Sequence, residues 1–540
     1  MSVFRSRIDV RSESFARNRE EMLSLVARLA ELNTRGRHKS EQRKPRFVER
    51  GQLTPRERLS RLLDPGMPFL SIGNLAGYLL DTADEAKSMP GGNAIAGIGF
   101  VRGVRCMVVV NDSGIQAGAL TSATGFRVRR SQEIALRQKL PFVHLVESAG
   151  ANLMEYTVEG FLEGGTLFAN LARLSAAGVP VITLLHGSST AGGAYMPGLS
   201  DYVVGVKGRG RAFLAGPPLL KAATGEIATE EELGGAQMHA DVSGLVEYLA
   251  EDDGHGVQIG REVISRLNWN ERCLRREVGK FREPIYDPDE IAGVVPVDYR
   301  KPYEVREVVA RIVDGSEILD FKPRYGVSTV CLQAEVHGHA IGIISNNGPI
   351  DPDGATKAAQ FIQLCDQGDI PLVFLQNTTG YLVGTRYERA GMIKHGSKMI
   401  QAVTNTSVPR LTLMIGASYG AGNYGMCGRG YDPDFCMTWP NASTGVMGGD
   451  QAARTMSIVL EGAAKARGQE IDPAILADQE KMLVGHFDSQ SSAFYTSGHM
   501  LDDGMIDPRD TRKALAFLLD TVWEGRHRNV SPNSFGVARM

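Results

Sequence analysis

VITLLHGSSTAGGAY, residues 181–195, and LTLMIGASYGAGNYG, residues 411–425, share one plan in the two halves of this 540-residue chain. Each begins with an apolar run typical of a buried strand. Each then passes through a turn of small residues, after which a helix is predicted. A plan that occurs twice indicates an internal repeat.

Other segments repeat in the same order. The pairs are an amphipathic helix (56–66 and 305–315), a hairpin (95–112 and 329–347), a helix (131–140 and 357–369) and an apolar strand (141–151 and 371–381). Pro141 lies 51 positions before Gly192, and Pro371 lies 50 positions before Ala421. Short apolar strands that alternate with helices predict mostly parallel sheets covered on both faces. The predicted fold class is therefore α/β, with two tandem domains.

The prolines place the domain boundary. Residues 281–303 contain four prolines and little periodicity. We expect a helical N-terminal arm at 1–50, which covers the surface or a partner, an N-terminal domain at 51–285 and a C-terminal domain at 295–540.

Composition excludes several classes of protein. The net charge is −3, so no basic field recruits nucleic acid, and no apolar stretch approaches the ~20 residues that span a membrane. The N-terminus lacks the apolar core of a secretory signal, which favours a cytoplasmic protein. The six cysteines form no C-x-x-C pair and are expected to be buried thiols. The sequence contains no H-E-x-x-H motif, so no metal site is predicted.

The small-residue turns can present bare main-chain N–H groups at a helix start, which suits phosphate or an oxyanion. Phosphate is disfavoured, because the segment around Lys221 does not have Walker spacing. No Ser-His-Asp triad is legible, and His239 is expected to be structural. Glycines that merely permit close packing of helix on strand remain the alternative. Oxyanion stabilisation without a side-chain base suggests enolate chemistry.

Several long strings carry a family resemblance. They are RGQLTPRERLSRLLDPGMPFL (50–70), STAGGAYMPGLSD (189–201), FLAGPPLLKAATGE (213–226), PYEVREVVARIVDGSEI (302–318) and SYGAGNYGMCGRGYDPDF (418–435). From about Arg50 to Trp523 the chain resembles the carboxyltransferase (beta) subunits of biotin-dependent acyl-CoA carboxylases. The resemblance implies two crotonase-like domains, each a ββα superhelix of the ClpP/crotonase type.

The resemblance also implies roles for individual residues. The N–H groups of Gly192 and Gly193 would bind the thioester oxygen, and those of Ala421 and Gly422 would bind the ureido oxygen of biotin. The acyl-CoA side would include Ala151, Gly164, Ala191 and Lys221, and the biotin side would include Thr379, Gly380, Tyr381, Gly384, Asn423 and Tyr424. The active site would lie between the N-domain of one subunit and the C-domain of another.

Two strings indicate a branch of the family. SYGAGNYGM and QNTTGYLVG (376–384) resemble the 3-methylcrotonyl-CoA and geranyl-CoA carboxylases, whereas propionyl- and acetyl-type enzymes tend to have Asp where Tyr424 stands. The methylcrotonyl pattern has Phe at the place of Gly164 in LEGGTLF. Glycine there would leave room for a longer acyl group such as geranyl, and a loop or cap glycine with no pocket role is the alternative.

Biotin would be carried by another chain, since this one has no M-K-M biotinylation site and no ATP-grasp-like glycine loop. The expected partners are a biotin carboxylase and biotin carrier alpha subunit and other copies of this chain, in a dimer-based hexamer within an α6β6 holoenzyme. The alternatives are a propionyl- or acetyl-CoA carboxylase beta subunit, the carboxyltransferase of a biotin-dependent decarboxylase or transcarboxylase, and a biotin-independent crotonase-type hydratase or isomerase.

Overall fold

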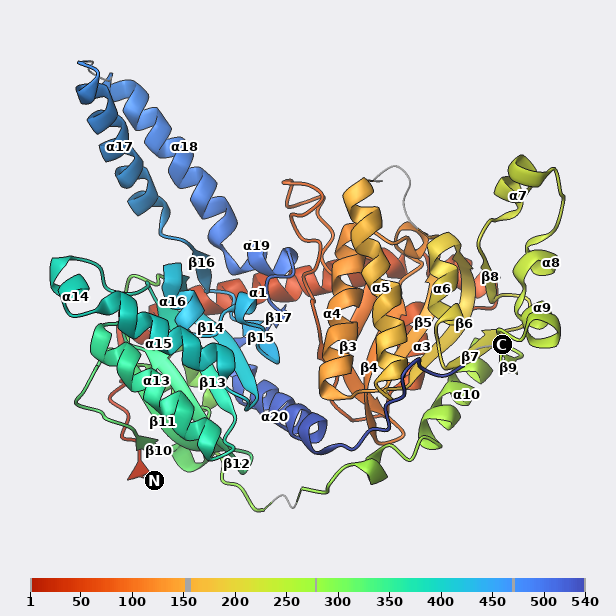
Figure 1. The fold of residues 1–540 in the computed structure, drawn as a ribbon, viewed down its shortest axis with the longest axis horizontal. Coiled ribbons are helices and arrows are strands. Elements are labelled where there is room, and N and C mark those ends of the chain that lie inside the picture. Colours follow the sequence, from red (N-terminus) through yellow and green to blue (C-terminus); the bar gives the residue numbers. More distant parts are fainter. Residues whose placement is uncertain (1, 151–156, 277–278, 469–471, 539–540) are drawn as a thin grey trace. The chain divides into compact units, whose positions relative to one another are not determined.

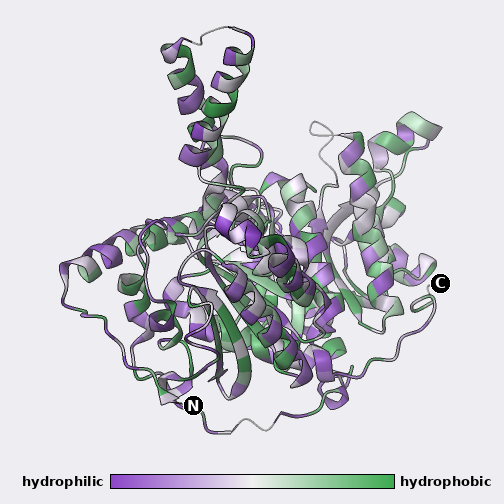
Figure 2. Ribbon diagram, turned by 60° about the vertical axis from the view of Figure 1, so that its left-hand side comes forward, coloured by the Kyte–Doolittle hydropathy of each residue, from purple (hydrophilic) through white to green (hydrophobic). Residues whose placement is uncertain are grey.

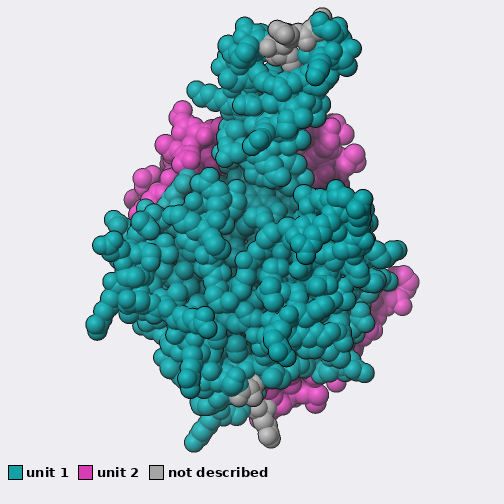
Figure 3. Space-filling view, turned by 90° about the vertical axis from the view of Figure 1, so that its left-hand side faces the viewer, with its two compact units in different colours: residues 1–30, 277–497, 501–519 teal, residues 31–276, 498–500, 520–540 magenta. Residues whose placement is uncertain are grey.

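The computed structural model describes residues 2–150, 157–276, 279–468 and 472–538. The chain forms two compact units, coloured separately in Figure 3. Unit 1 consists of residues 1–30, 277–497 and 501–519, and unit 2 consists of residues 31–276, 498–500 and 520–540. Each unit contains one large sheet. The domain limits of 51–285 and 295–540 stay a prediction.

Unit 2 contains an eight-stranded sheet in the order β2-β3-β4-β5-β6-β7-β9, with β8 paired to β6. Its strands are β2 Leu70–Ser71, β3 Ala94–Val101, β4 Val104–Asn111, β5 Phe142–Ser148, β6 Val181–Thr190, β7 Tyr202–Val206, β8 Arg211–Phe213 and β9 Tyr248–Ala250. Its helices are α2 Lys44–Glu49, α3 Pro55–Leu62, η1 Gln116–Gly118, α4 Ser122–Gln138, α5 Val158–Ala176, η3 Ala191–Ala194, α6 Tyr195–Gly198, α7 Pro217–Thr224, α8 Glu230–Gly234, α9 Ala236–Met238, η4 His239–Ser243, α10 Asp253–Ser265 and η5 Asn270–Arg272.

Unit 1 contains a nine-stranded sheet in the order β1-β10-β11-β12-β13-β14-β15-β17, with β16 paired to β14. Its strands are β1 Ser2–Val3, β10 Glu317–Asp320, β11 Thr329–Val336, β12 His339–Asn346, β13 Leu372–Thr378, β14 Arg410–Tyr419, β15 Phe435–Thr438, β16 Ser443–Gly445 and β17 Gly504–Met505. Its helices are η6 Pro288–Glu290, α11 Ile291–Val294, α12 Val305–Val309, η7 Asp314–Ser316, α13 Pro352–Gln367, α14 Thr385–Arg389, α15 Met392–Asn405, α16 Gly420–Gly425, η8 Arg429–Tyr431, α17 Gly449–Ala466, α18 Pro473–Ser491, α19 Ala493–Gly498 and η9 Pro508–Asp510.

Among the described residues, three helices have residues in both units: α1 Glu13–Glu41, α19 Ala493–Gly498, of which only Gly498 is in unit 2, and α20 Thr511–His527. Within unit 1, α17 and α18 pack side by side and extend away from the sheet (Figure 1).

The two sheets repeat one topology. An antiparallel hairpin, β3–β4 or β11–β12, is followed by parallel strands, β5–β6–β7 or β13–β14–β15. These strands are buried along almost their whole length, as their continuous apolar sequences predict, and strands of unit 1 are coloured largely as hydrophobic in Figure 2. The helix that follows each hairpin is capped by a side chain, Thr121 for α4 and Asp351 for α13. The internal repeat predicted from the sequence is confirmed.

The structure also tests the expectations on helix ends, cysteine burial and membrane helices. The helices predicted over 56–66 and 305–315 end early, at Leu62 and Val309. Five of the six cysteines are buried and free, as expected, and Cys273 is free but only half-buried. No helix among the described residues combines the length and apolar character needed to cross a membrane.

Candidate active site

The first predicted turn lies in unit 2, at the end of β6. After Thr190, Ala191 takes a left-handed backbone with a φ of 52°, and the chain enters a short helical turn. The first N–H groups of such a turn have no acceptor within the helix. The Ser189 hydroxyl donates a 2.7 Å hydrogen bond to the Gly193 carbonyl and fixes the turn from behind. The N–H groups of Gly192 and Gly193 therefore stand at the carboxyl end of β6 without a bulky side chain of their own.

The second turn lies in unit 1, at the end of β14. Gly420 follows Tyr419 and takes a φ of 54°, and α16 begins there. Gly422 is buried against the preceding strand: a Cβ built on it would lie 2.8 Å from the Gly380 Cα and 2.9 Å from the Thr378 Cγ2. A side chain at position 422 would push the turn away from β13, so the geometry requires glycine there.

Buried polar side chains anchor this second turn. The Asn423 amide donates a 2.7 Å hydrogen bond to the Ser418 hydroxyl, which in turn donates to Gln376 Oε1 at 2.5 Å. The Gln376 amide donates to the Met426 carbonyl at 2.7 Å. Asn423, expected on the biotin side, thus holds the turn on the end of the sheet.

The two turns are structurally equivalent. The left-handed residues, Ala191 and Gly420, occupy the same place after equivalent strands. The strand residue before each turn pairs with a second parallel strand, Thr190 with Phe213 and Tyr419 with Gly445. Both neighbouring strands also shift register just before this point, between Val146 and Ser148 and between Gln376 and Thr378. The alignment that sequence spacing proposed for these positions therefore agrees with the backbone.

A cavity of about 370 Å³ adjoins the unit 1 turn. Thr379 and Tyr419 line it together with Tyr299 and the start of α17. The Tyr299 and Tyr419 rings lie 5.2 Å apart, and Tyr419 Oη is 2.7 Å from Ser443 Oγ. Burial, together with hydrogen bonding to Tyr419, raises the pKa of Tyr299 to about 12, so its hydroxyl stays protonated. Neither tyrosine was predicted from the sequence, because Tyr419 at the end of β14 resembles a core residue and Tyr299 stands in the proline-rich segment 281–303.

The other predicted biotin-side residues lie on the loop after β13 or on α16. Gly380 has a φ of 118°, and its carbonyl accepts a hydrogen bond from the Ile350 N–H. Tyr381 is half-buried, and burial raises the pKa of its hydroxyl. Gly384 caps the start of α14, further along this loop. Tyr424 is half-exposed beside Tyr431, with ring centroids 5.6 Å apart.

On the acyl side, α5 covers the unit 2 turn. Phe168 on α5 would lie 3.4 Å from a Cβ at Gly192, and its ring is 5.7 Å from that of Tyr195. Gly164 is one helical turn earlier, on the same face of α5. Among the described residues, no heavy atom lies within 4 Å of a Cβ built at Gly164. A side chain at position 164 would therefore meet no described neighbour beyond its own helix.

The remaining predicted residues are less tightly placed. Ala151 lies outside the described residues. Lys221 is exposed on α7, and its side chain makes no hydrogen bond or ion pair within the described parts of the chain. His239 Nε2 lies 2.8 Å from the Ala212 carbonyl and Nδ1 lies 2.6 Å from the Ser243 hydroxyl. Both ring nitrogens are used, as expected for a structural histidine.

A basic cavity of about 350 Å³ opens beside the strand ends of unit 2. Arg43, Arg46 and Arg50 line one side, and Ser148 and Ser188, from the ends of β5 and β6, line the other. The three arginines follow helical spacing around α2, so they share one face. Residues 1–50 were expected only to form an arm, although the spacing of these three arginines was the signal that could have revealed a site.

A buried ionic network supports the same strand ends. Arg58 is 3.0 Å from Asp253 and 2.5 Å from Glu147, and His186 Nδ1 is 2.8 Å from Asp253. Burial would raise the pKa of Asp253, but the His186 hydrogen bond and the Arg58 charge outweigh it and lower that pKa. Burial lowers the pKa of His186, which is therefore neutral and donates to Asp253. Glu147 immediately precedes Ser148, so the network fixes the end of β5.

Comparison with known protein families identifies the class of protein. The carboxyl transferase domain model matches residues 47–536, so the chain belongs to this family.

Among residues 2–150, 157–276, 279–468 and 472–538, no group of three His, Cys, Asp or Glu side chains is placed to hold a metal ion.

Individual relatives show which members of the family this chain is similar to. The chain is 48% identical over 501 residues to a probable biotin-dependent acyl-coenzyme A carboxylase beta2 subunit of Mycobacterium tuberculosis, covering 92% of this chain and 93% of the relative. It is 41% identical to a probable mitochondrial methylcrotonoyl-CoA carboxylase beta chain of Drosophila melanogaster, covering 100% and 95%. The crystal structure of the P. aeruginosa geranyl-CoA carboxylase beta subunit superposes with a TM-score of 0.93 at 53% identity and full coverage of both chains. The predicted family and its crotonase-like α/β fold are confirmed.

Proposed function

We propose that this chain transfers a carboxyl group from biotin, carried on a separate subunit, to a branched enoyl-CoA, with geranyl-CoA preferred to 3-methylcrotonyl-CoA. Membership of the carboxyl transferase family supports carboxyl transfer as the reaction. The names of the relatives support biotin as the carboxyl carrier and an acyl-CoA as the acceptor. The observation that carries the choice of acyl group is the open space at Gly164.

The unit 2 turn supplies the enolate site. Removal of a proton from the acyl group places negative charge on the thioester oxygen. The N–H groups of Gly192 and Gly193 would donate to that oxygen, with Ser189 holding the turn in place. The loss of one such donor in an acyl-transfer enzyme costs roughly 3–4 kcal/mol of transition-state stabilisation. Main-chain donors need no rearrangement as the charge develops.

The unit 1 turn fits the biotin ureido group. The N–H groups of Ala421 and Gly422 would donate to the ureido oxygen, and the neighbouring cavity lined by Thr379 and Tyr419 would take the ring system. Biotin, when bound, supplies the carboxyl group and afterwards accepts the proton. The turn is closely packed on Gly380, so its position is fixed relative to that cavity.

The basic cavity of unit 2 would hold the phosphates of coenzyme A. Arg43, Arg46 and Arg50 are exposed on one side of it, and guanidinium groups bind phosphate strongly. The opposite wall comes from the ends of β5 and β6, and β6 continues directly into the Gly192 turn. The coenzyme would therefore be anchored beside the oxyanion site.

Gly164 provides the experiment. In holoenzyme reconstituted with the biotin-carrying subunit, Gly164→Phe would fill the open space and lower kcat/KM for geranyl-CoA by about 100-fold, while 3-methylcrotonyl-CoA is still carboxylated. Gly165→Phe is the matched control, since Gly165 is exposed on the same helix and also faces no neighbour within 4 Å among the described residues. Equal losses for the two thioesters, or a natural enzyme that prefers 3-methylcrotonyl-CoA, would refute the assignment.

The resemblance to the family also supports a proposed assembly. It is a beta hexamer within a cytoplasmic α6β6 holoenzyme, with the two turns from different subunits facing one active site. Co-purification with a biotinylated, ATP-binding chain would support it. Co-purification with a membrane decarboxylase or a second acyl acceptor would favour the decarboxylase or transcarboxylase alternative, and activity without biotin would favour a hydratase or isomerase.

A further inference from the structure

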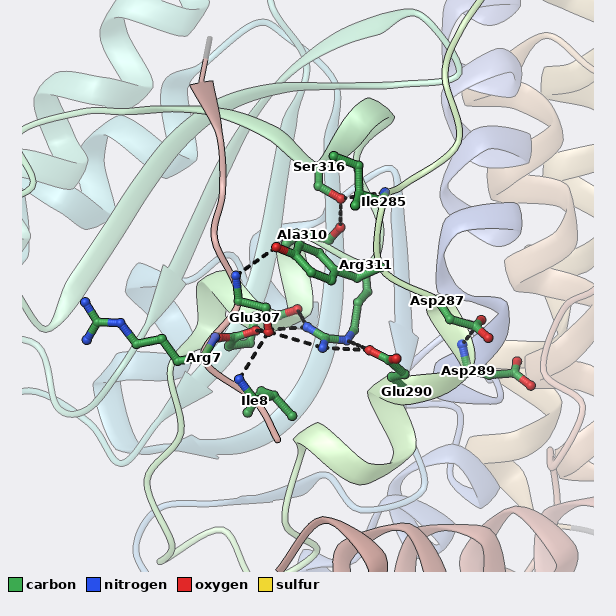
Figure 4. Close-up of polar contacts among 12 residues, drawn as sticks. Arg7, Ile8, Ile285, Asp287, Asp289, Glu290, Glu307, Ala310, Arg311 and Ser316 are labelled. Atoms are coloured by element: carbon green, nitrogen blue, oxygen red, sulfur yellow. Dashed lines mark hydrogen bonds and ion pairs between the residues drawn. The ribbon is translucent and has the colours of Figure 1, made fainter. Parts of the chain in front are cut away.

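The N-terminal residues Ser6 and Arg7 bind the buried carboxylate of Glu307 in unit 1. Glu307 accepts hydrogen bonds from the Ser6 hydroxyl at 2.6 Å and from the Arg7 N–H at 2.7 Å (Figure 4). Arg311 neutralises Glu307 at 3.0 Å and also contacts Glu290 at 2.8 Å. Glu307 and Arg311 are both almost fully buried. The main chain of residues 2–8 is therefore a fixed part of unit 1, and it can form one wall of a binding site.

This segment encloses a cavity of about 630 Å³ against residues 294–307. Small-molecule sites typically measure about 300–1,000 Å³. The apolar part of the wall comes from Phe4, Ile8, Val294 and Pro296. None of the lining residues belongs to the 420–425 turn or to the cavity beside it. The site is therefore separate from the proposed biotin site within unit 1.

Several basic side chains that form no ion pair with a described residue line the cavity. Arg5, Arg7, Arg17 and Lys301 line it, and their charged groups form no ion pair with any described residue. Figure 4 shows the Arg7 side chain extending away from Glu307.

The acidic side chains of the lining do not offset this charge. Glu307 is committed to Ser6, Arg7 N–H and Arg311, while Glu304 accepts from Arg306 and from the Asn347 amide. The cavity should therefore attract an anion with several charges.

A buried hydroxyl belongs to one of the residues that line the cavity. Tyr303 lines the cavity, and its Oη atom is buried without a hydrogen-bond partner among the described residues. A buried hydroxyl that lacks a partner is unfavourable, and a hydrogen bond to a ligand oxygen would remove that cost. Burial raises the pKa of the Tyr303 phenol, so the group stays neutral and can donate a hydrogen bond to an anion. The Tyr303 ring adds to the apolar wall.

We propose that this cavity binds a nucleoside polyphosphate. The apolar wall would take the base and sugar, the four cations would take the phosphates, and the Tyr303 hydroxyl would donate to a ligand oxygen. The volume fits a nucleotide, and a recessed hydroxyl favours a small molecule over an acidic peptide lying across the surface. The inference depends on unit 1 alone and does not rest on the proposed carboxyl transfer.

Isothermal titration of the full chain with ADP tests the proposal. We expect saturable 1:1 binding, with adenosine and tripolyphosphate each binding at least about ten-fold more weakly, because each offers only half of the required contacts. Tyr303→Phe keeps the ring and should weaken ADP about ten-fold, as expected for the loss of a hydrogen bond to a charged group. Arg5→Gln/Arg7→Gln should weaken it by about three- to ten-fold and reduce its salt dependence.

Arg11→Gln is the matched control, because Arg11 is exposed near the same segment and does not line the cavity. It should leave ADP binding unchanged. Thermal unfolding of each variant would establish that it is folded. Absence of saturable ADP binding to the natural chain, unchanged affinity in Tyr303→Phe, or equal affinity for ADP and tripolyphosphate would each overturn the assignment.

Discussion

Replacing Arg58 with methionine would leave two buried carboxylates without their shared cation. Arg58 is 1% exposed, Asp253 is 2% exposed and Glu147 is 13% exposed, so water cannot fully replace the guanidinium. Breaking a buried ion pair by removing one partner costs roughly 3–5 kcal/mol. Methionine is chosen because it preserves much of the volume and removes only the charge and its donors.

The structure places the expected loss at the lower end of that range. Asp253 would keep hydrogen bonds from the Leu53 N–H and from His186, each 2.8 Å long. Glu147 would lose its one ion pair within the described parts of the chain. We therefore expect a loss of about 3 kcal/mol, mostly from Glu147. In a unit of this size, that corresponds to a fall of about 6–12 °C in the unfolding temperature.

Differential scanning calorimetry of the full chain would measure this fall. Hydrogen exchange would locate it, with faster exchange expected along β5 and β6. Arg61→Met is the matched control, since Arg61 is exposed on the same helix α3, and it should change stability by less than about 0.5 kcal/mol. A further variant, Glu147→Gln in the Arg58→Met background, should recover part of the loss. Equal effects of Arg58→Met and Arg61→Met would show that the network does not stabilise the fold.

Three other changes test separate features. Burial raises the pKa of Asp502 to about 7, so the stability that its protonated form contributes is complete below pH ~3.8 and is lost as the pH rises through 7. Asp502→Asn should therefore raise the unfolding temperature at pH 8.5, and should raise it less at pH 5. The opposite order would contradict this expectation. Gly422→Ala should cost about 1–3 kcal/mol in chemical denaturation and slow carboxyl transfer, because its methyl group would lie 2.8 Å from the Gly380 Cα; a fully active, equally stable variant would refute the packing argument. Ala191→Gly should change stability by less than about 1 kcal/mol, because relief of the left-handed φ offsets the added chain entropy, and a larger loss on calorimetry would argue against strain there.

The repeat and its turns were predictable because their signals are local. A buried strand and a small-residue turn each occupy a short window, and two copies at matched spacing reinforce each other. Gly164 was singled out by comparison with the methylcrotonyl pattern of the family, which predicted neither its place inside α5 nor its neighbours. The open space there depends on how α5 meets β6, which no single window encodes.

The missed features depend on contacts between distant segments. The Arg43, Arg46 and Arg50 cavity exists because α2 folds against strand ends about 100 to 145 residues further along the chain. The segment Ser2–Val3 pairs with β10, but a two-residue strand is too short to have a period. Tyr299 was assigned only to a proline-rich linker, since the cavity that it lines is formed by Tyr419 and α17.

The matched turns at Ala191 and Gly420 change how mutations can act on this protein. In the proposed mechanism the donors belong to the main chain, so no exchange of one side chain for another deletes them, except by proline. Damage must instead come from displacement, through added bulk or loss of a support such as Ser189 or Asn423. Each copy is therefore free to vary the chemistry of its neighbours while the two hydrogen-bonding cradles themselves persist.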